Sequence, residues 1–220
     1  MMLKTTEPLN ATNKPTAVRL PRYAQVIRDL PPGDYPYTKL LPELRKSPAL
    51  KRIAPDPVVR RLLLRQAQVL LCGDRGYAFV DVEVPRVVLS ERYYHEGNDL
   101  DLYLDLVHEL THLRQIQQGF DLWDDRFAYV DRPTEVEAYA VAVAEGRRLG
   151  MSISDVRTHL DNPWMSASDV DRLLEHIENF LAFGSLPNLD AALTGATFVV
   201  RHPWRCPPAT PLIRAAGRKR

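Results

Sequence analysis

The sequence predicts an α+β fold that is mostly helical, with a small β-sheet beside one long central helix and a helical extension at the C-terminal end. Residues 98–118 contain neither proline nor glycine and are apolar on nearly every side of a helix, which is typical of a buried helix. Two short apolar segments, 77–82 and 86–90, precede it and are typical of strands. A helical period with one apolar face continues over 166–181.

The first half of the predicted core begins at Pro57. Proline at the first turn followed by leucines predicts a helix over 58–71, and Gly73 is placed to end it. The two predicted strands follow, and a short connection over 91–97 leads to the central helix. Asn98 is a good N-cap for that helix, and Gly119 ends it.

A second central helix is expected to begin at Pro133. Proline fits the first helical position, and acidic side chains in the first turn complement the helix dipole. Its alanines favour close packing against the first central helix. Further along, Ser152 and Ser154 are candidate caps for a short helix that ends near Leu160, and Ser166 or Ser168 for the last helix.

Composition divides the chain into three zones. Residues 1–56 hold nine of the 18 prolines and are expected to be an N-terminal extension that wraps the surface or is partly mobile. Residues 57–150 form the predicted core. Residues 151–220 are expected to form a helical C-terminal subdomain and a tail.

Charge and hydropathy exclude several classes of protein. The net charge of +1, from 29 basic and 28 acidic residues, gives no reason to expect nucleic-acid binding by bulk charge. The sequence has no long apolar span and no apolar signal segment, so we expect no membrane contact and a cytoplasmic location. Only two cysteines, Cys72 and Cys206, argue against a disulfide framework.

The most informative motif is His-Glu-x-x-His at residues 108–112 in the central helix. Residues four apart on a helix lie about 40° apart around its axis, so the imidazoles of His108 and His112 can reach one metal ion. Glu109 is adjacent and can face a metal-bound water instead of the metal. This arrangement, with two nitrogen ligands, an open position and a general base, is typical of a zinc hydrolase.

A third ligand is expected from the start of the second central helix. Glu135 and Glu137 are two residues apart, so they point about 200° away from each other and only one can face the metal. Glu137 is preferred because it lies deeper in the helix beside the small Ala138. Glu135 is expected to be a first-turn carboxylate that serves the helix N-terminus.

With these residues, the segment 86–150 resembles the gluzincin metallopeptidases, and is similar especially to minigluzincins and ImmA/IrrE-like peptidases. The resemblance implies a zincin-like core over 57–150, zinc bound by His108, His112 and Glu137, and Glu109 as the catalytic base. The thermolysin type places an aspartate four residues after the ligand glutamate, where this chain has Val141. Support for His108 must then come from elsewhere.

Other residues have weaker claims to a role. Tyr129 is a candidate for stabilising an oxyanion, although a packing role is the simpler expectation. Arg132 is a candidate for binding a substrate carboxylate. His95 is expected at the surface, and three further histidines lack ligand spacing and are expected to be exposed or structural: His159, His176 and His202.

The expected function is zinc-dependent hydrolysis of peptide bonds, with a peptide or protein as the partner. Residues 87–89 are the candidate edge strand to which an extended substrate would add. The enzyme is expected to be latent or weakly active because a terminal segment covers the cleft, and the N-terminal zone is one candidate cover. Cys206 is a candidate occupant of the open zinc position, although an ordinary thiol is the simpler expectation. Two alternatives remain: a zinc-binding regulatory or sensor protein that cleaves little, and a metal-free helical interaction domain.

Overall fold

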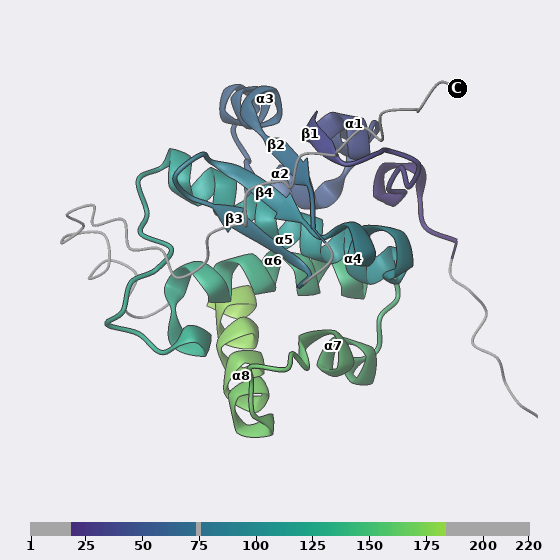
Figure 1. Cartoon of the computed structure of the whole chain (residues 1–220). Coiled ribbons are helices and arrows are strands. Elements are labelled where there is room, and N and C mark those ends of the chain that lie inside the picture. Colours follow the sequence, from purple (N-terminus) through teal and green to yellow (C-terminus); the bar gives the residue numbers. More distant parts are fainter. Residues whose placement is uncertain (1–18, 74–75, 184–220) are drawn as a thin grey trace, which may run out of the picture.

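The computed structural model describes residues 19–73 and 76–183 and confirms an α+β fold (Figure 1). Four short strands form one mixed sheet in the order β1-β2-β4-β3. They are β1 (Gly33–Pro36), β2 (Gln68–Leu71), β3 (Ala78–Asp81) and β4 (Arg86–Leu89). The pairs β1–β2 and β3–β4 are antiparallel, whereas β2 and β4 run parallel.

The predicted strands at 77–82 and 86–90 are confirmed, but the helix expected over 58–71 is too long. Helix α3 (Pro57–Gln66) begins at its predicted proline, and the Asp56 carboxylate caps it by accepting from Val58 and Val59 N–H. The chain then enters β2, which lies between β1 and β4 in the sheet. The Val69 and Leu71 side chains of β2 are buried. A short apolar run is compatible with a helix or with a strand, and here the strands that pair with residues 68–71 on both sides favour the strand.

The position of β4 corrects the predicted substrate edge. Residues 87–89 pair with β2 on one side and β3 on the other, so their backbone is not free to accept a further strand. The two edges of the sheet are β1 and β3. The error follows from β2, which covers the other side of β4 and lay in the expected helix.

Residues 19–56 belong to the core and do not merely wrap the surface. They form η1 (Arg22–Ala24), β1, α1 (Tyr37–Leu40), η2 (Leu44–Lys46) and α2 (Pro48–Ile53). Their leucines pack in the same cluster as the central helix: Leu40, Leu41, Leu44 and Leu50. Ser47 caps α2, and Pro48 takes its first position. The prolines here therefore begin helices and turns instead of preventing structure.

Helices α5 (Asp99–Gln117) and α6 (Pro133–Arg148) form the centre of the molecule. Asn98 caps α5 as predicted, with its side chain accepting from Leu100 and Asp101 N–H. The expected connection before it contains a further helix, α4 (Glu91–Glu96). Helix α5 contacts β3 and β4 on one side and α6 on another. Buried alanines of α6, including Ala138 and Ala142, permit this close packing.

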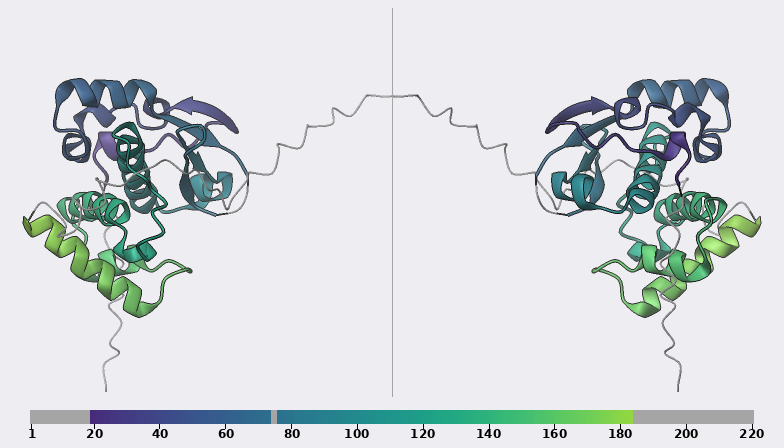
Figure 2. Two further views of the ribbon diagram at one scale, coloured as in Figure 1. Left: turned by 90° about the vertical axis from the view of Figure 1, so that its left-hand side faces the viewer. Right: turned by 90° about the vertical axis from the view of Figure 1, so that its right-hand side faces the viewer.

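The C-terminal part described by the structure consists of α7 (Ile153–Leu160) and α8 (Ala167–Phe183). Ser152 caps α7, and the Ser166 side chain accepts from Asp169 N–H at the start of α8. These helices pack on α6 in a second apolar cluster, at the end of the molecule opposite α3 (Figure 2). None of the helices in the described ranges is long and apolar enough to cross a bilayer.

Candidate metal centre

The two motif histidines meet as their spacing predicts. His108 and His112 lie one turn apart on α5, with their Nε2 atoms 2.9 Å apart and their ring centroids 4.6 Å apart. Both side chains are buried. Two imidazole nitrogens therefore converge on one point between α5 and α6.

The third group at this point is Glu135, at the start of α6. Its Oε2 lies 3.4 Å from His108 Nε2 and 3.5 Å from His112 Nε2, and the three ligand atoms all lie within 4.8 Å of one another. Ligand atoms about 2.0–2.1 Å from a tetrahedral zinc ion are separated by about 3.3 Å, which the two carboxylate distances match. Glu135 Oε2 is buried and has no hydrogen-bond partner among the described residues. The donor set therefore fits a divalent metal ion.

The expected ligand Glu137 lies elsewhere, which corrects the choice between the two glutamates. Its Oε1 is 2.6 Å from Arg114 Nη2, and its Oε2 accepts from Gln115 Nε2 at 2.8 Å. Because Glu135 and Glu137 point in nearly opposite directions around α6, the rotation of the helix that brings Glu135 to the histidines turns Glu137 away. The carboxylate that joins the two histidines in the candidate metal site is thus the one in the first turn of α6.

Glu137 nevertheless contributes to the site through Gln115. The Gln115 amide donates to Thr134 O at 3.0 Å and to Glu137, which leaves its Oε1 to accept from His112 Nδ1 at 2.7 Å. A proton fixed on Nδ1 leaves Nε2 as the lone-pair atom of a neutral ring, and Nε2 faces Glu135. Gln115 therefore orients His112 and joins it to the helix that carries Glu135.

Tyr139 lies beside His108, and Tyr129 lies beside Tyr139. The Tyr139 ring is 4.2 Å from the His108 ring, and its hydroxyl is 2.9 Å from that of Tyr129. Tyr139 stands four residues after Glu135, the place where the thermolysin type has its aspartate. His108 Nδ1 is buried without a hydrogen-bond partner among the described residues, so packing against Tyr139, and not a hydrogen bond to Nδ1, supports this side of the ring. Burial raises the pKa of both tyrosines, which keeps their hydroxyls protonated.

Burial and mutual charge set the protonation of the cluster. Burial raises the pKa of Glu109 to about 8. Burial alone would lower the pKa of His112, but the Glu135 carboxylate raises it to about 9, while burial and His112 lower that of His108 to about 4. His112 and His108 hold the pKa of Glu135 well below its usual range against the opposing effect of burial. In the metal-free protein, protonated His112 and the Glu135 carboxylate therefore form an ion pair. A metal ion that binds here must displace the proton of His112.

The remaining candidates have structural surroundings. Arg132 lies over the Trp123 and Tyr129 rings, and its Nη1 is 4.0 Å from Glu135 Oε1. His95 is exposed beside Tyr94, whereas His159 is mostly buried and bonded to Asp101, and His176 bonds Asp131. His202 and Cys206 lie outside the described residues.

Gln115 and Tyr139, which lie beside the candidate metal ligands, were not predicted from the sequence. Gln115 lies three residues after His112, and this helical spacing is the pattern that could have indicated it. Tyr139 lies four residues after Glu135, one turn along α6, so the choice of Glu135 as the third ligand would have indicated it.

The metal centre is closed in. Its four ionisable groups expose 4–7% of their surface. The two cavities described, of about 730 and 180 Å³, are lined by other residues. The small His-His-Glu set is therefore recognised by its donor geometry and not by an open cleft.

No protein-family model, curated protein or solved structure matches this chain. The fold and the site together define an α+β protein with a buried His-His-Glu group that could hold a metal ion. The likeness to gluzincins rests on the motif residues alone.

Proposed function

We propose that the protein is a zinc-dependent metallopeptidase that hydrolyses peptide bonds. The observation that carries this proposal is the convergence of His108, His112 and Glu135 on one buried point, with Glu109 adjacent on α5. Three protein ligands of this kind leave a fourth position, which is typical of catalytic zinc sites and not of closed structural ones.

Zinc is favoured by the donor set, because imidazoles with one carboxylate suit zinc better than the hard cations that prefer oxygen alone. Zinc in this place would supply a Lewis acid and lower the pKa of a bound water. The low His108 pKa leaves its ring neutral at neutral pH, and the Gln115 bond to Nδ1 directs His112 Nε2 toward the site, where a metal ion would replace its proton.

Glu109 is the residue that would move the proton. It is not a member of the ligand cluster, and its pKa of about 8 lies near neutral pH, where a general base can both accept and return a proton. In this role Glu109 takes a proton from the attacking water and delivers it to the leaving amine. The paired hydroxyls of Tyr129 and Tyr139 are protonated, the Tyr139 ring lies beside His108, and both hydroxyls are candidates for stabilising the oxyanion.

Strand β3 replaces β4 as the proposed substrate edge. Among the described residues it is paired on only one side, with β4, and it contacts α5, the helix that carries the motif. An extended peptide that adds to β3 would gain backbone hydrogen bonds along this edge.

The proposal is tested by incubating the zinc-loaded chain with a degenerate peptide pool and identifying the products. We expect the wild type to cleave and Glu109→Gln to retain zinc but lose at least about 100-fold in rate, as expected for a lost general base. Glu91→Gln is a matched control, because it makes the same change outside the ligand cluster. Equal cleavage by wild type and Glu109→Gln would contradict the role of Glu109.

The second candidate is a zinc-binding regulatory protein that cleaves little or nothing. The near-complete burial of all four ionisable groups favours it, because a substrate carbonyl must reach the metal. In that case the wild type retains zinc but cleaves no member of the peptide pool, and a chain shortened at either end behaves in the same way.

A further inference from the structure

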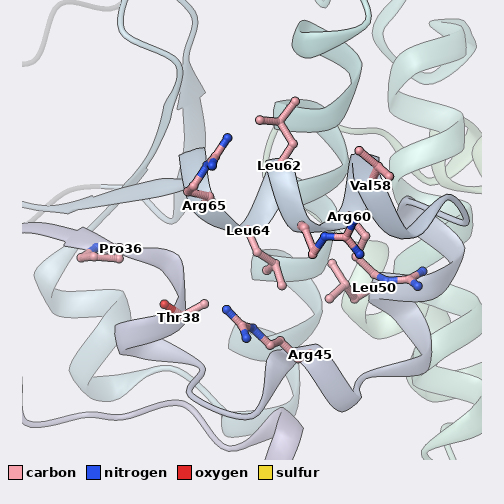
Figure 3. A pocket seen from close by; sticks show the side chains of 10 residues that line it. Pro36, Thr38, Arg45, Leu50, Val58, Arg60, Leu62, Leu64 and Arg65 are labelled. Carbon is pink, nitrogen blue, oxygen red and sulfur yellow. The ribbon is translucent and has the colours of Figure 1, made fainter.

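A cavity of about 730 Å³ lies away from the metal centre, between α3 and the segment that runs from β1 to α2 (Figure 3). Four arginines line it, Arg45 from η2 and Arg60, Arg61 and Arg65 from α3, and no acidic residue does. In Figure 3, Arg45 extends from the wall opposite α3, with aliphatic side chains between the two walls.

The arginines that line this cavity form no salt bridge within the described chain. None of the four arginines pairs with a carboxylate there, whereas arginines elsewhere, such as Arg114 and Arg157, do. Residues 45–65 contain seven basic residues and one acidic residue, Asp56, in a chain whose net charge is only +1. Asp56 is exposed and accepts backbone hydrogen bonds at the start of α3. The cavity is therefore a concentrated positive site.

One of the arginines is held in place by the backbone. Arg60 Nη1 donates to Ala54 O at 2.7 Å and to Pro55 O at 3.2 Å. Arg45, Arg61 and Arg65 are exposed. A fixed guanidinium with three adjustable ones around it suits an anionic partner that presents several charges.

The same face of α3 also exposes aliphatic side chains. Val58, Arg61, Leu62 and Arg65 follow the spacing i, i+3, i+4, i+7, which places them on one side of the helix. Val58 and Leu62 are 62% and 38% exposed, although both line the cavity, while Leu63 is the residue of α3 that is fully buried in the core. The surface thus combines exposed apolar area with unpaired positive charge.

We propose that this cavity is a docking site for an acidic amphipathic segment of another protein. Aliphatic side chains of the partner would cover Val58 and Leu62, and its carboxylates would pair with Arg45, Arg61 and Arg65. A phosphate-bearing partner such as a nucleic acid would use the arginines but leave the aliphatic face exposed. This inference does not depend on the proposed hydrolytic activity.

Composition indicates that the partner is a different chain. Residues 1–18 contain one acidic and two basic residues, and residues 184–220 contain one acidic and six basic residues. Neither segment offers the run of carboxylates that would complement four arginines.

The test is a random-peptide display selection on the immobilised full chain, with counter-selection on Arg61→Glu/Arg65→Glu. We expect the enriched peptides to carry carboxylates and aliphatic side chains at helical spacing. A synthetic copy should bind the wild type with micromolar affinity, about tenfold or more weakly to the charge-reversed variant, and more weakly as salt is raised. Val58→Ser/Leu62→Ser should weaken binding as well, while Arg19→Glu/Arg22→Glu, an equal charge change outside the cavity, should not.

Three results would overturn the proposal. The first is an enriched pool without excess acidic residues, and the second is a pool that binds the charge-reversed variant equally well. The third is a DNA duplex or inorganic triphosphate that binds through the arginines with no dependence on Val58 and Leu62 and displaces the peptides. Thermal unfolding verifies that each variant is folded. If the charge-reversed variant is not folded, the proposal is tested by Val58→Ser/Leu62→Ser and by the salt dependence of binding to the wild type.

Discussion

Glu109 is a buried carboxyl whose ionisation is unfavourable in the folded metal-free protein. Burial raises its pKa from the ordinary 4.5 to about 8, so the folded chain binds this proton more tightly than the unfolded chain does. Stability from this group is fully present below about pH 4.5 and is lost as pH rises toward 8. By pH 8 the loss amounts to about 3–5 kcal/mol.

Glu109→Gln removes this penalty, because its side chain cannot ionise. We expect the metal-free variant to be more stable than the metal-free wild type at pH 8, with a much smaller difference at pH 5. Urea unfolding at both pH values, with a chelator present, measures this. If the difference in unfolding free energy between variant and wild type is the same at pH 5 and pH 8, burial does not raise the pKa of Glu109.

The choice between Glu135 and Glu137 shows what sequence spacing can and cannot determine at the residue scale. The i, i+4 spacing of His108 and His112 fixes their relation because both belong to one helix. Spacing also shows that Glu135 and Glu137 face opposite ways, but not which of them reaches the two histidines. That depends on the rotation of α6, which its packing against two apolar clusters sets.

At the element scale, Gln115 joins α5 to α6 and holds the His112 ring. We expect Gln115→Ala to weaken zinc binding by about 10–100-fold, because His112 Nδ1 and Thr134 O both lose their partner. Gln117→Ala, on the exposed side of the same helix, is the matched control and should leave affinity unchanged. Competition with a chromophoric chelator measures both affinities, and equal values for the two variants would remove Gln115 from the site.

The elements that the sequence predicted best are those with strong local features. Caps and periodic apolar residues placed α5, α6, α7 and α8 within a few residues of their observed bounds. Strand β1 was missed because its sequence, Gly-Asp-Tyr-Pro, is typical of a turn, and β2 because its apolar residues continue the apolar run of α3. Pairing between residues distant in sequence leaves no local pattern that distinguishes such a strand from a turn or the end of a helix.

At the scale of the whole molecule, residues 19–56 are part of the fold and not a removable cover. A chain that begins at residue 57 would lose four leucines that expose at most 1% of their surface: Leu40, Leu41, Leu44 and Leu50. At about 1.5–3 kcal/mol each, this loss is comparable with the entire stability of a typical domain. We expect the shortened chain to show no cooperative unfolding by circular dichroism. Cooperative unfolding would instead show that residues 57–183 fold without residues 19–56, as the sequence predicted.

The central claim is that His108, His112 and Glu135 together hold one metal ion. The most direct measurement is the metal content per chain, by elemental analysis, of protein purified without added metal. We predict about one zinc per chain for the wild type and for Glu137→Ala, and almost none for His112→Ala and Glu135→Ala. Zinc retained by Glu135→Ala but lost from Glu137→Ala, or a wild type that contains no metal and takes up none, would contradict the account.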